Sequence, residues 1–255
     1  MNIWKICILC MQVLSMSCIY AAQNTPECQK KYETLLQNPP NLNELVFHTD
    51  CGLMNMMEIQ KVSEIKYGSN TDFLDKVLRV ANTHGISQGV AVDLGSGTGV
   101  WTKHLLSLKT WIVHAVDVFP ESLKALAAST SEADKQRLVL QNEDFRDMHL
   151  PQNVDLIIAN NSLCFVPRKD LDSVLDTVYH HLKPGGIFAA TFWGKGDIRA
   201  KDHNLSTFSP EEVKKLLDGK YTIIQCCTSL DGEAENLDGK VVPWSVVYAI
   251  VQKPK

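Results

Sequence analysis

The stretch Asp93-Leu-Gly95-Ser96-Gly97-Thr-Gly99 directly follows a short apolar run, residues 90–92, and directly precedes apolar residues at helical spacing. Glycines at alternate positions let the backbone turn sharply and let a ligand approach main-chain amides without a Cβ in the way. Ligands of open α/β sheets bind outside the carboxyl ends of the strands, where Asp93 is expected. The stretch therefore predicts a strand–loop–helix turn that binds a nucleotide-like ligand.

A second acid strengthens this interpretation. Asp117 lies 24 residues after Asp93, at the end of the next predicted strand, and an acceptor there can bind both hydroxyls of a ribose. Two cofactor classes fit so far, a nicotinamide dinucleotide and S-adenosylmethionine. The dinucleotide fingerprint needs Gly or Ala at its sixth position, where this chain has Val100, and its additional glycine is Gly99 at the fifth. A nicotinamide dinucleotide therefore fits this loop less well than S-adenosylmethionine does.

The segments around this loop alternate between helical and strand-like patterns. Helices are predicted over residues 72–83, 100–108, 121–128 and 169–182, and one more after Ser209. Strands are predicted over residues 90–94, 111–118, 138–141, 154–160, 187–192, 221–228 and 244–252, with an acidic loop over 231–239. Alternation of this kind indicates parallel pairing with helices on both faces. We expect an α/β fold with a Rossmann-like, seven-stranded, mostly parallel sheet that ends in an antiparallel C-terminal strand pair.

The amino terminus has the layout of a secretory signal. One positive charge in residues 1–5 precedes the almost wholly apolar residues 6–16, and small residues end the stretch at Ala22. We therefore predict a signal peptide over residues 1–22, cleaved near Ala21 or Ala22, and an exported (periplasmic or secreted) protein. The alternatives are an uncleaved anchor over residues 6–22, whose length is near that of a membrane span, and a buried first helix in a cytoplasmic protein.

Residues 23–69 are predicted to be an N-terminal extension, with a short helix over 54–66, and residues 70–255 the main domain. Cys28 and Cys51 flank the Pro39-Pro40 breaker in the extension. A disulfide between them is a hypothesis that suits an oxidising compartment.

Composition excludes several other classes. The 255 residues carry 25 Lys+Arg against 29 Asp+Glu, a net charge of −4, so no overall field attracts a polyanion and we expect no nucleic-acid partner. No Cys-x-x-Cys pair occurs in the body of the chain, and no metal site is expected. Oligomeric state stays open.

At these residues the chain resembles the class I S-adenosylmethionine-dependent methyltransferases, from about Phe73 to the carboxyl terminus. The segment 93–99 resembles their first motif and Asp117 their ribose-binding acid, while Glu143-Asp144-Phe145 is similar to the segment that contacts adenine. Residues 153–160 resemble the fourth-strand motif and residues 181–188 the turn into the fifth strand. The resemblance implies S-adenosylmethionine as cofactor, held by Asp93, Gly95, Ser96, Gly97, Gly99, Asp117, Val118, Asp144, Phe145 and Asn160.

Two further segments narrow the expected chemistry. Residues 160–165 followed by 191–197 are similar to small-molecule enzymes of the tellurite-resistance type. The Asn/Asp-Pro-Pro-Tyr box, which the resemblance would link to methylation of amino groups on bases or glutamine, is absent, because residues 160–163 read Asn-Asn-Ser-Leu. We therefore expect a transferase that moves the methyl group of S-adenosylmethionine to a small molecule by in-line displacement.

No residue is identifiable as a catalytic base, and alignment of the reactants is expected to be the main contribution. We expect Cys164 to pack in the core, and His180 and His181 to lie at the end of a helix. His203 is a less favoured candidate for proton transfer. Trp193 and Trp244 fit either a substrate wall or the core. The alternatives to this enzyme are an exported, non-catalytic cofactor-binding or interaction protein and a nicotinamide-dependent oxidoreductase.

Overall fold

The computed structural model describes residues 46–49, 52–55, 70–201, 205–235 and 241–255. The chain divides into two compact units, residues 1–67 with 233–242, and residues 68–232 with 243–255. In the first unit a small antiparallel hairpin joins β1 (Val46–Thr49) to β2 (Gly52–Asn55). The predicted helix over 54–66 is wrong at its start, since Met54 and Asn55 belong to β2. The signal peptide and the Cys28–Cys51 pairing lie outside the described residues.

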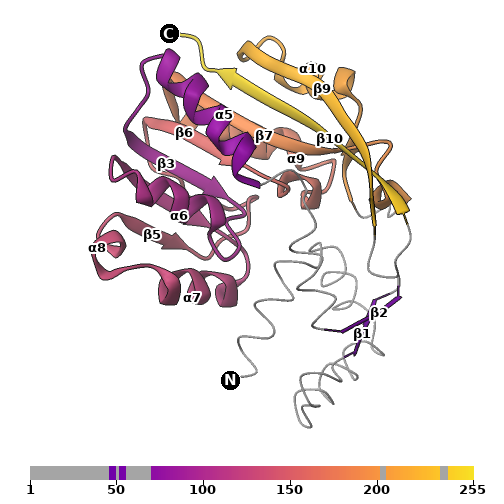
Figure 1. Ribbon diagram of the computed structural model, residues 1–255. Coiled ribbons are helices and arrows are strands. Elements are labelled where there is room, and N and C mark those ends of the chain that lie inside the picture. Colours follow the sequence, from indigo (N-terminus) through magenta and orange to yellow (C-terminus); the bar gives the residue numbers. More distant parts are fainter. Residues whose placement is uncertain (1–45, 50–51, 56–69, 202–204, 236–240) are drawn as a thin grey trace. The chain divides into compact units, whose positions relative to one another are not determined.

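The second unit is built on one mixed sheet (Figure 1). Its strand order is β5-β4-β3-β6-β7-β10-β9, with the short β8 paired to β7. The strands that pair in parallel are β3 (Gly89–Leu94), β4 (Trp111–Val116), β5 (Leu138–Gln141), β6 (Val154–Ala159), β7 (Leu182–Gly194) and β8 (Thr207–Phe208). β10 (Val241–Gln252) runs antiparallel to β7, and β9 (Thr222–Glu235) is the edge strand beside it. The predicted α/β sheet is confirmed, and the two-residue β8 is an addition.

Helices cover both faces of this sheet, as Figure 1 shows. The helices α5 (Asn70–Thr83) and α6 (Val100–Ser107) share one apolar core cluster with β3, β4, β6 and β7. The helices α9 (Leu171–His181) and α10 (Pro210–Leu217) share a second cluster with the other face. α7 (Pro120–Ser129) packs through Leu123 and Leu126 against Ala115 of β4. This three-layer arrangement removes nearly every side chain of β3 and β6 from solvent.

Local signals explain several helix ends. Pro occupies the first turn of both α7 and α10, where its missing N–H costs no hydrogen bond. Ser209 caps α10 in a capping box with Glu212. After α5 the chain turns at Gly85, whose φ of 80° is left-handed, so the predicted stop there is confirmed.

Several predicted boundaries are wrong because long-range pairing extends the strands. β9 continues to Glu235, into the predicted acidic loop, and β7 begins at Leu182 rather than at residue 187. Three short helical segments had no sequence signal strong enough to predict them: α8 (Glu132–Lys135) and the 3-10 turns η1 (Leu163–Phe165) and η2 (Ile198–Lys201).

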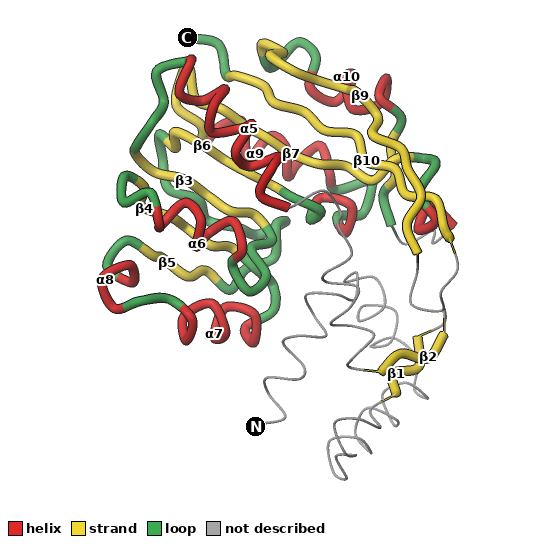
Figure 2. Tube along the Cα trace, viewed as in Figure 1, coloured by secondary structure: helices red, strands yellow, loops and turns green. Residues whose placement is uncertain are grey.

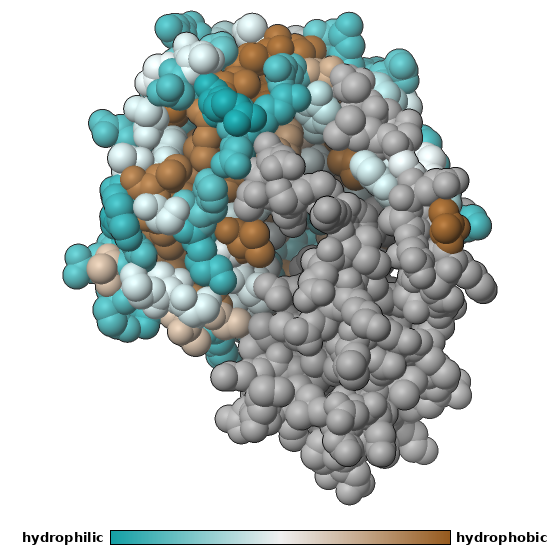
Figure 3. Space-filling view, viewed as in Figure 1, coloured by the Kyte–Doolittle hydropathy of each residue, from teal (hydrophilic) through white to brown (hydrophobic). Residues whose placement is uncertain are grey.

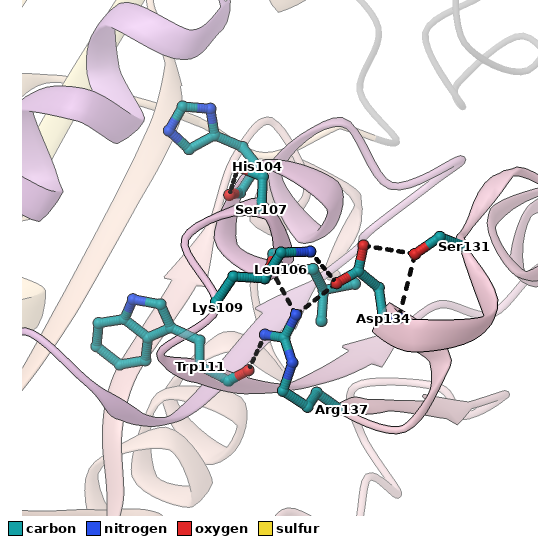
Figure 4. Close-up of polar contacts among 8 residues, drawn as sticks. All are labelled: His104, Leu106, Ser107, Lys109, Trp111, Ser131, Asp134 and Arg137. Carbon is teal, nitrogen blue, oxygen red and sulfur yellow. Dashed lines mark hydrogen bonds and ion pairs between the residues drawn. The ribbon is translucent and has the colours of Figure 1, made fainter.

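A polar network fastens the elements next to β4, as Figure 4 shows. The guanidinium of Arg137 donates to the carbonyl oxygen of Trp111 at 3.0 Å and to that of Leu106 at 2.8 Å, and it pairs with Asp134 at 2.5 Å. Lys109 adds a second, more exposed pair with Asp134 at 2.7 Å. Arg137 therefore joins the end of α6, the start of β4 and α8.

The surface of the described residues mixes hydrophilic and hydrophobic side chains, as the view in Figure 3 shows. The large apolar residues that are exposed are Val100, Leu108, Ile112, Val118, Val139, Leu140 and Val241. No helix among the described residues has both the length and the apolar character needed to cross a bilayer.

Candidate functional site

The loops that follow β3 and β4 meet at the carboxyl end of the sheet (Figure 2). In the glycine loop, residues 93–99, the N–H groups of Gly95 and Ser96 both donate to the carbonyl oxygen of Val116, at 2.8 and 3.1 Å. The N–H of Gly97 donates to Oδ2 of Asp117 at 2.8 Å. The loop is thus tied to the end of β4, and the two strand ends named by the sequence are brought together.

The three glycines of this loop have different roles, although each has a positive φ (73°, 53° and 83°). A Cβ on Gly95 would lie 2.4 Å from Cβ of Ser162, and a Cβ on Gly99 would lie 2.2 Å from Cδ1 of Leu126. A Cβ on Gly97 would meet no atom within 4 Å. Protein atoms therefore fill the space beside Gly95 and Gly99, and among these three positions only Gly97 borders open space. The prediction treated the three alike, and the structure separates them.

Asp93 is buried at the end of β3, with 3% of its surface exposed. Its Oδ2 accepts a 2.6 Å hydrogen bond from Oγ1 of Thr102 on α6. Burial raises the pKa of the Asp93 carboxyl to about 6, the hydrogen bond from Thr102 opposes that shift, and the nearby charge of Asp117 adds to it. Asp93 thus holds α6 against the loop and places a titratable acid beneath it.

Asp117 is 1% exposed and directly follows β4. Its two carboxyl oxygens each accept one backbone N–H at 2.8 Å, from Gly97 and from Phe119. Desolvation raises the pKa of Asp117, against the lowering effect of those two bonds. A carboxylate can accept about four hydrogen bonds, so the two backbone bonds leave Asp117 acceptor capacity for a ligand hydroxyl.

Two buried hydroxyls in the same loop have no hydrogen-bond partner: Oγ of Ser96 and Oγ1 of Thr98. Buried polar atoms are almost always paired, and an unpaired one calls for a water, an ion or a ligand. Ser96 was predicted as a site residue and Thr98 was not. Because both flank Gly97, where a ligand has space, they fit the charged amino-acid end of S-adenosylmethionine.

The segment expected to hold adenine lies beside the loop. The ring of Phe145 reaches 3.4 Å from the position of a Cβ on Gly95, and Val118 is 44% exposed directly after Asp117. Asp144 points both carboxyl oxygens at Arg146, at 2.8 and 2.7 Å, and this side-chain hydrogen bonding lowers the pKa of Asp144. Phe145 and Val118 thus offer apolar surface near the loop, and Asp144 is already engaged by a cation.

A third group of predicted residues follows β6. The hydroxyl of Thr191 on β7 lies 3.0 Å from Oδ1 of Asn160 and accepts the N–H of Asn161 at 2.7 Å. Asn161 has a left-handed φ of 52°, and its Oδ1 accepts Nε1 of Trp193 at 3.3 Å. Asn160 therefore lies at the same edge of the sheet as the two acids, in a polar junction whose members Thr191 and Trp193 come from β7.

The remaining candidates have structural surroundings. Cys164 is fully buried and not disulfide-bonded, and Trp193 is buried with its ring 5.3 Å from that of Phe165. Nδ1 of His180 donates to the carbonyl of Asp176 and Nδ1 of His181 to that of Pro151. His203 lies outside the described residues. Among the residues that the structure describes, no cluster of three or more His, Cys, Asp or Glu could hold a metal ion.

Comparison with known proteins finds sequence similarity to methyltransferases over part of the chain. Residues 92–188 match the family model described as a methyltransferase domain. A protein of Claviceps purpurea named "Methyltransferase" is 30% identical over 122 residues, which cover 48% of this chain and 37% of that protein. The chain spans about half or less of the length of the curated relatives it matches.

Solved structures show the same fold. The structure of TehB from Haemophilus influenzae has a TM-score of 0.59 and 18% identity, covering 70% of this chain and 62% of its own. The N-methyltransferase NodS from Bradyrhizobium japonicum, in complex with S-adenosylhomocysteine, has a TM-score of 0.55 and 15% identity, covering 72% of this chain and 87% of its own. Residues 92–188 thus match a methyltransferase-domain model, and the chain shares its Rossmann-like fold with these solved structures.

Proposed function

We propose that this chain, which carries a methyltransferase domain over residues 92–188, binds S-adenosylmethionine at the glycine loop and transfers its methyl group to a small-molecule acceptor. The observation that carries the proposal is the pair of buried, unpartnered hydroxyls of Ser96 and Thr98 around the open space at Gly97. A bound ligand with charged hydrogen-bonding groups would give both hydroxyls a partner.

The chain's own residues divide the binding work. Asp117 would accept the ribose hydroxyls with its remaining acceptor capacity, and Ser96 and Thr98 would contact the amino-acid end of the cofactor. Phe145 and Val118 would pack against the adenine ring. Asp93 lies one layer deeper and holds α6 through Thr102, so it would act on the ligand through its charge and through the loop.

Bound S-adenosylmethionine supplies an electrophilic methyl group on a positively charged sulfur. The task left to the protein is to align a nucleophile with the sulfur–methyl bond and to exclude water, which is worth up to several kcal/mol. The junction of Asn160, Asn161 and Thr191 offers neutral amide and hydroxyl groups at this edge of the sheet. A neutral polar lining favours an acceptor atom that arrives with a free lone pair.

The test is titration calorimetry of the full chain with S-adenosylhomocysteine and, separately, with a nicotinamide dinucleotide. Asp117→Asn keeps one acceptor oxygen but loses the charge, and a charge-assisted hydrogen bond is worth about 1.5–3 kcal/mol. We expect the variant to bind S-adenosylhomocysteine at least about tenfold more weakly. The control, Asp176→Asn, removes only a surface pair with Lys220 and is expected to bind as wild type. Unchanged affinity in Asp117→Asn would remove the ribose role, and nicotinamide binding alone would favour the oxidoreductase.

The finer parts of the proposal concern the subgroup and the compartment. We place the enzyme with small-molecule methyltransferases of the tellurite-resistance type, supported by residues 160–165 and 191–197, and we propose that it is exported after cleavage near Ala22. Cys226 is disulfide-bonded, which favours an oxidising compartment. Mass spectrometry of the protein from its native source tests this: a mature chain beginning near residue 23 supports export, and an intact Met1 contradicts it.

A further inference from the structure

One contact ties the glycine loop to the segment that follows β6. Oγ of Ser162 donates a 2.7 Å hydrogen bond to the carbonyl oxygen of Leu94, at the start of that loop. The Cβ of Ser162 fills the position beside Gly95, 2.4 Å from where a Cβ would stand. Ser162 is buried, with 3% of its surface exposed. Both the hydrogen bond and the packing contact therefore act on the backbone of the loop without water between them.

The same side chain is held in place from β7. The hydroxyl of Thr191 accepts the N–H of Asn161 at 2.7 Å, so the residue directly before Ser162 is fixed to the neighbouring strand. The φ of Asn161 is left-handed, 52°, a backbone conformation that Asn adopts more readily than most non-glycine residues. Thr191 and Asn161 thus set the direction in which the chain leaves β6 and carries Ser162 to the loop.

Phe145 approaches the same position, with its ring 3.4 Å from the same hypothetical Cβ. Ser162, from the segment after β6, and Phe145, from the segment after β5, therefore both occupy the space beside Gly95. If the Ser162 contact is lost, the first half of the loop loses a buried hydrogen bond and a packing contact, and keeps its backbone bonds to Val116.

We propose that Ser162 is a positioning residue that holds the glycine loop in its cofactor-binding conformation, and that through it the segment 160–165 is mechanically linked to the cofactor site. The inference rests on the proposed function only in its choice of ligand. It predicts that Ser162 affects cofactor affinity without itself contacting the cofactor, because the groups that face Gly97 depend on where residues 94–96 lie.

The experiment compares Ser162→Ala and Ser162→Gly with a matched control, Ser206→Ala. Ser206 is also buried, and its Oγ donates to the carbonyl of Val166 at 2.8 Å, so its loss removes the same kind of bond outside the loop. Urea unfolding and calorimetry with S-adenosylhomocysteine are measured on the full chain for all four proteins.

We expect Ser162→Ala and Ser206→Ala to lower the urea midpoint to similar extents. Only the Ser162 variants should bind S-adenosylhomocysteine more weakly, by roughly three- to tenfold in Ser162→Ala and by more in Ser162→Gly, which also removes the contact with Gly95. Equal affinities of wild type, Ser162→Ala and Ser162→Gly would overturn the inference, as would an equal loss in Ser206→Ala. A wild-type chain that binds no S-adenosylhomocysteine would instead overturn the proposed function.

Discussion

Replacing Gly97 and Gly99 separately by Ala tests whether the open space in the glycine loop is the ligand site. Both residues have left-handed backbones, with φ of 53° and 83°, and alanine in that region costs about 1–2 kcal/mol. In Gly97→Ala this is the whole expected cost, because the new Cβ meets no atom within 4 Å.

Gly99→Ala has a further cost, because its Cβ would lie 2.2 Å from Cδ1 of Leu126. Leu126 is fully buried in the cluster with Ala115 and Leu123, and protein interiors are close-packed, so a shift of its side chain would disturb these neighbours. Overpacking of this kind costs about 1–3 kcal/mol, and Gly99→Ala should lose about 2–5 kcal/mol of unfolding free energy in all. Adding Leu126→Ala to Gly99→Ala should recover part of that loss relative to the sum of the single variants.

The more stable of these two variants should be the weaker binder of the ligand. Urea unfolding gives the stabilities, and calorimetry with S-adenosylhomocysteine below the unfolding transition gives the affinities. We expect Gly97→Ala to be the more stable variant and the poorer binder, since its methyl group enters the space left for the ligand. Wild-type affinity in Gly97→Ala would refute the placement of the ligand, and equal stabilities would refute the steric argument at Leu126.

Two further variants test the electrostatic and polar parts of the fold. The pKa of Asp93 is about 6 in the fold against an ordinary 3.8, so ionisation of this carboxyl destabilises the fold as pH rises from about 4 to about 6. Asp93→Asn should therefore gain stability relative to wild type across that range, by roughly 3 kcal/mol at pH 7. A difference in urea unfolding that does not change with pH would contradict the raised pKa. Arg137→Met should lose about 1–3 kcal/mol, because it removes the hydrogen bonds to the carbonyl oxygens of Trp111 and Leu106 and the pair with Asp134. Lys109→Met, which loses only an exposed pair with Asp134, should lose less than about 1 kcal/mol. Equal losses would show that the Arg137 network adds nothing.

Local signals made the main features of the site predictable. Asp93 and Asp117 each come at the end of a strand that reads as apolar in the sequence. The glycines of the loop all lie within residues 93–99, so the strand–loop–helix turn follows from neighbouring residues alone. The sheet follows in the same way, because alternating strands and helices leave few topologies for a parallel sheet.

The rest of the site depends on contacts between residues far apart in the chain. Thr102 of α6 reaches back to Asp93, and Ser162 reaches Leu94 from the segment after β6. No local pattern in the sequence pairs either residue with its partner. β9 runs on through Asp231 and Gly232, which have poor strand propensity, since it pairs with β10. Sequence periodicity records which face of an element is buried, but not which distant side chain touches it.

The two buried acids give the site a definite preference for the sign of a ligand's charge. Burial raises the pKa of both Asp93 and Asp117. Within the described residues, the hydrogen bonds to these two carboxyls come from Thr102 and from backbone N–H groups, not from a cationic side chain. Such a pair of buried acids lowers the stability of the fold at neutral pH. Apolar residues at these two positions would pack in the core without that loss of stability. A ligand that carries positive charge offsets that cost on binding, because it lowers both pKa values and is attracted by both carboxylates. S-adenosylmethionine, with its sulfonium and ammonium groups, meets this requirement. A neutral adenosine derivative without them should bind more weakly than S-adenosylmethionine, by a margin that grows as pH rises and the two acids ionise.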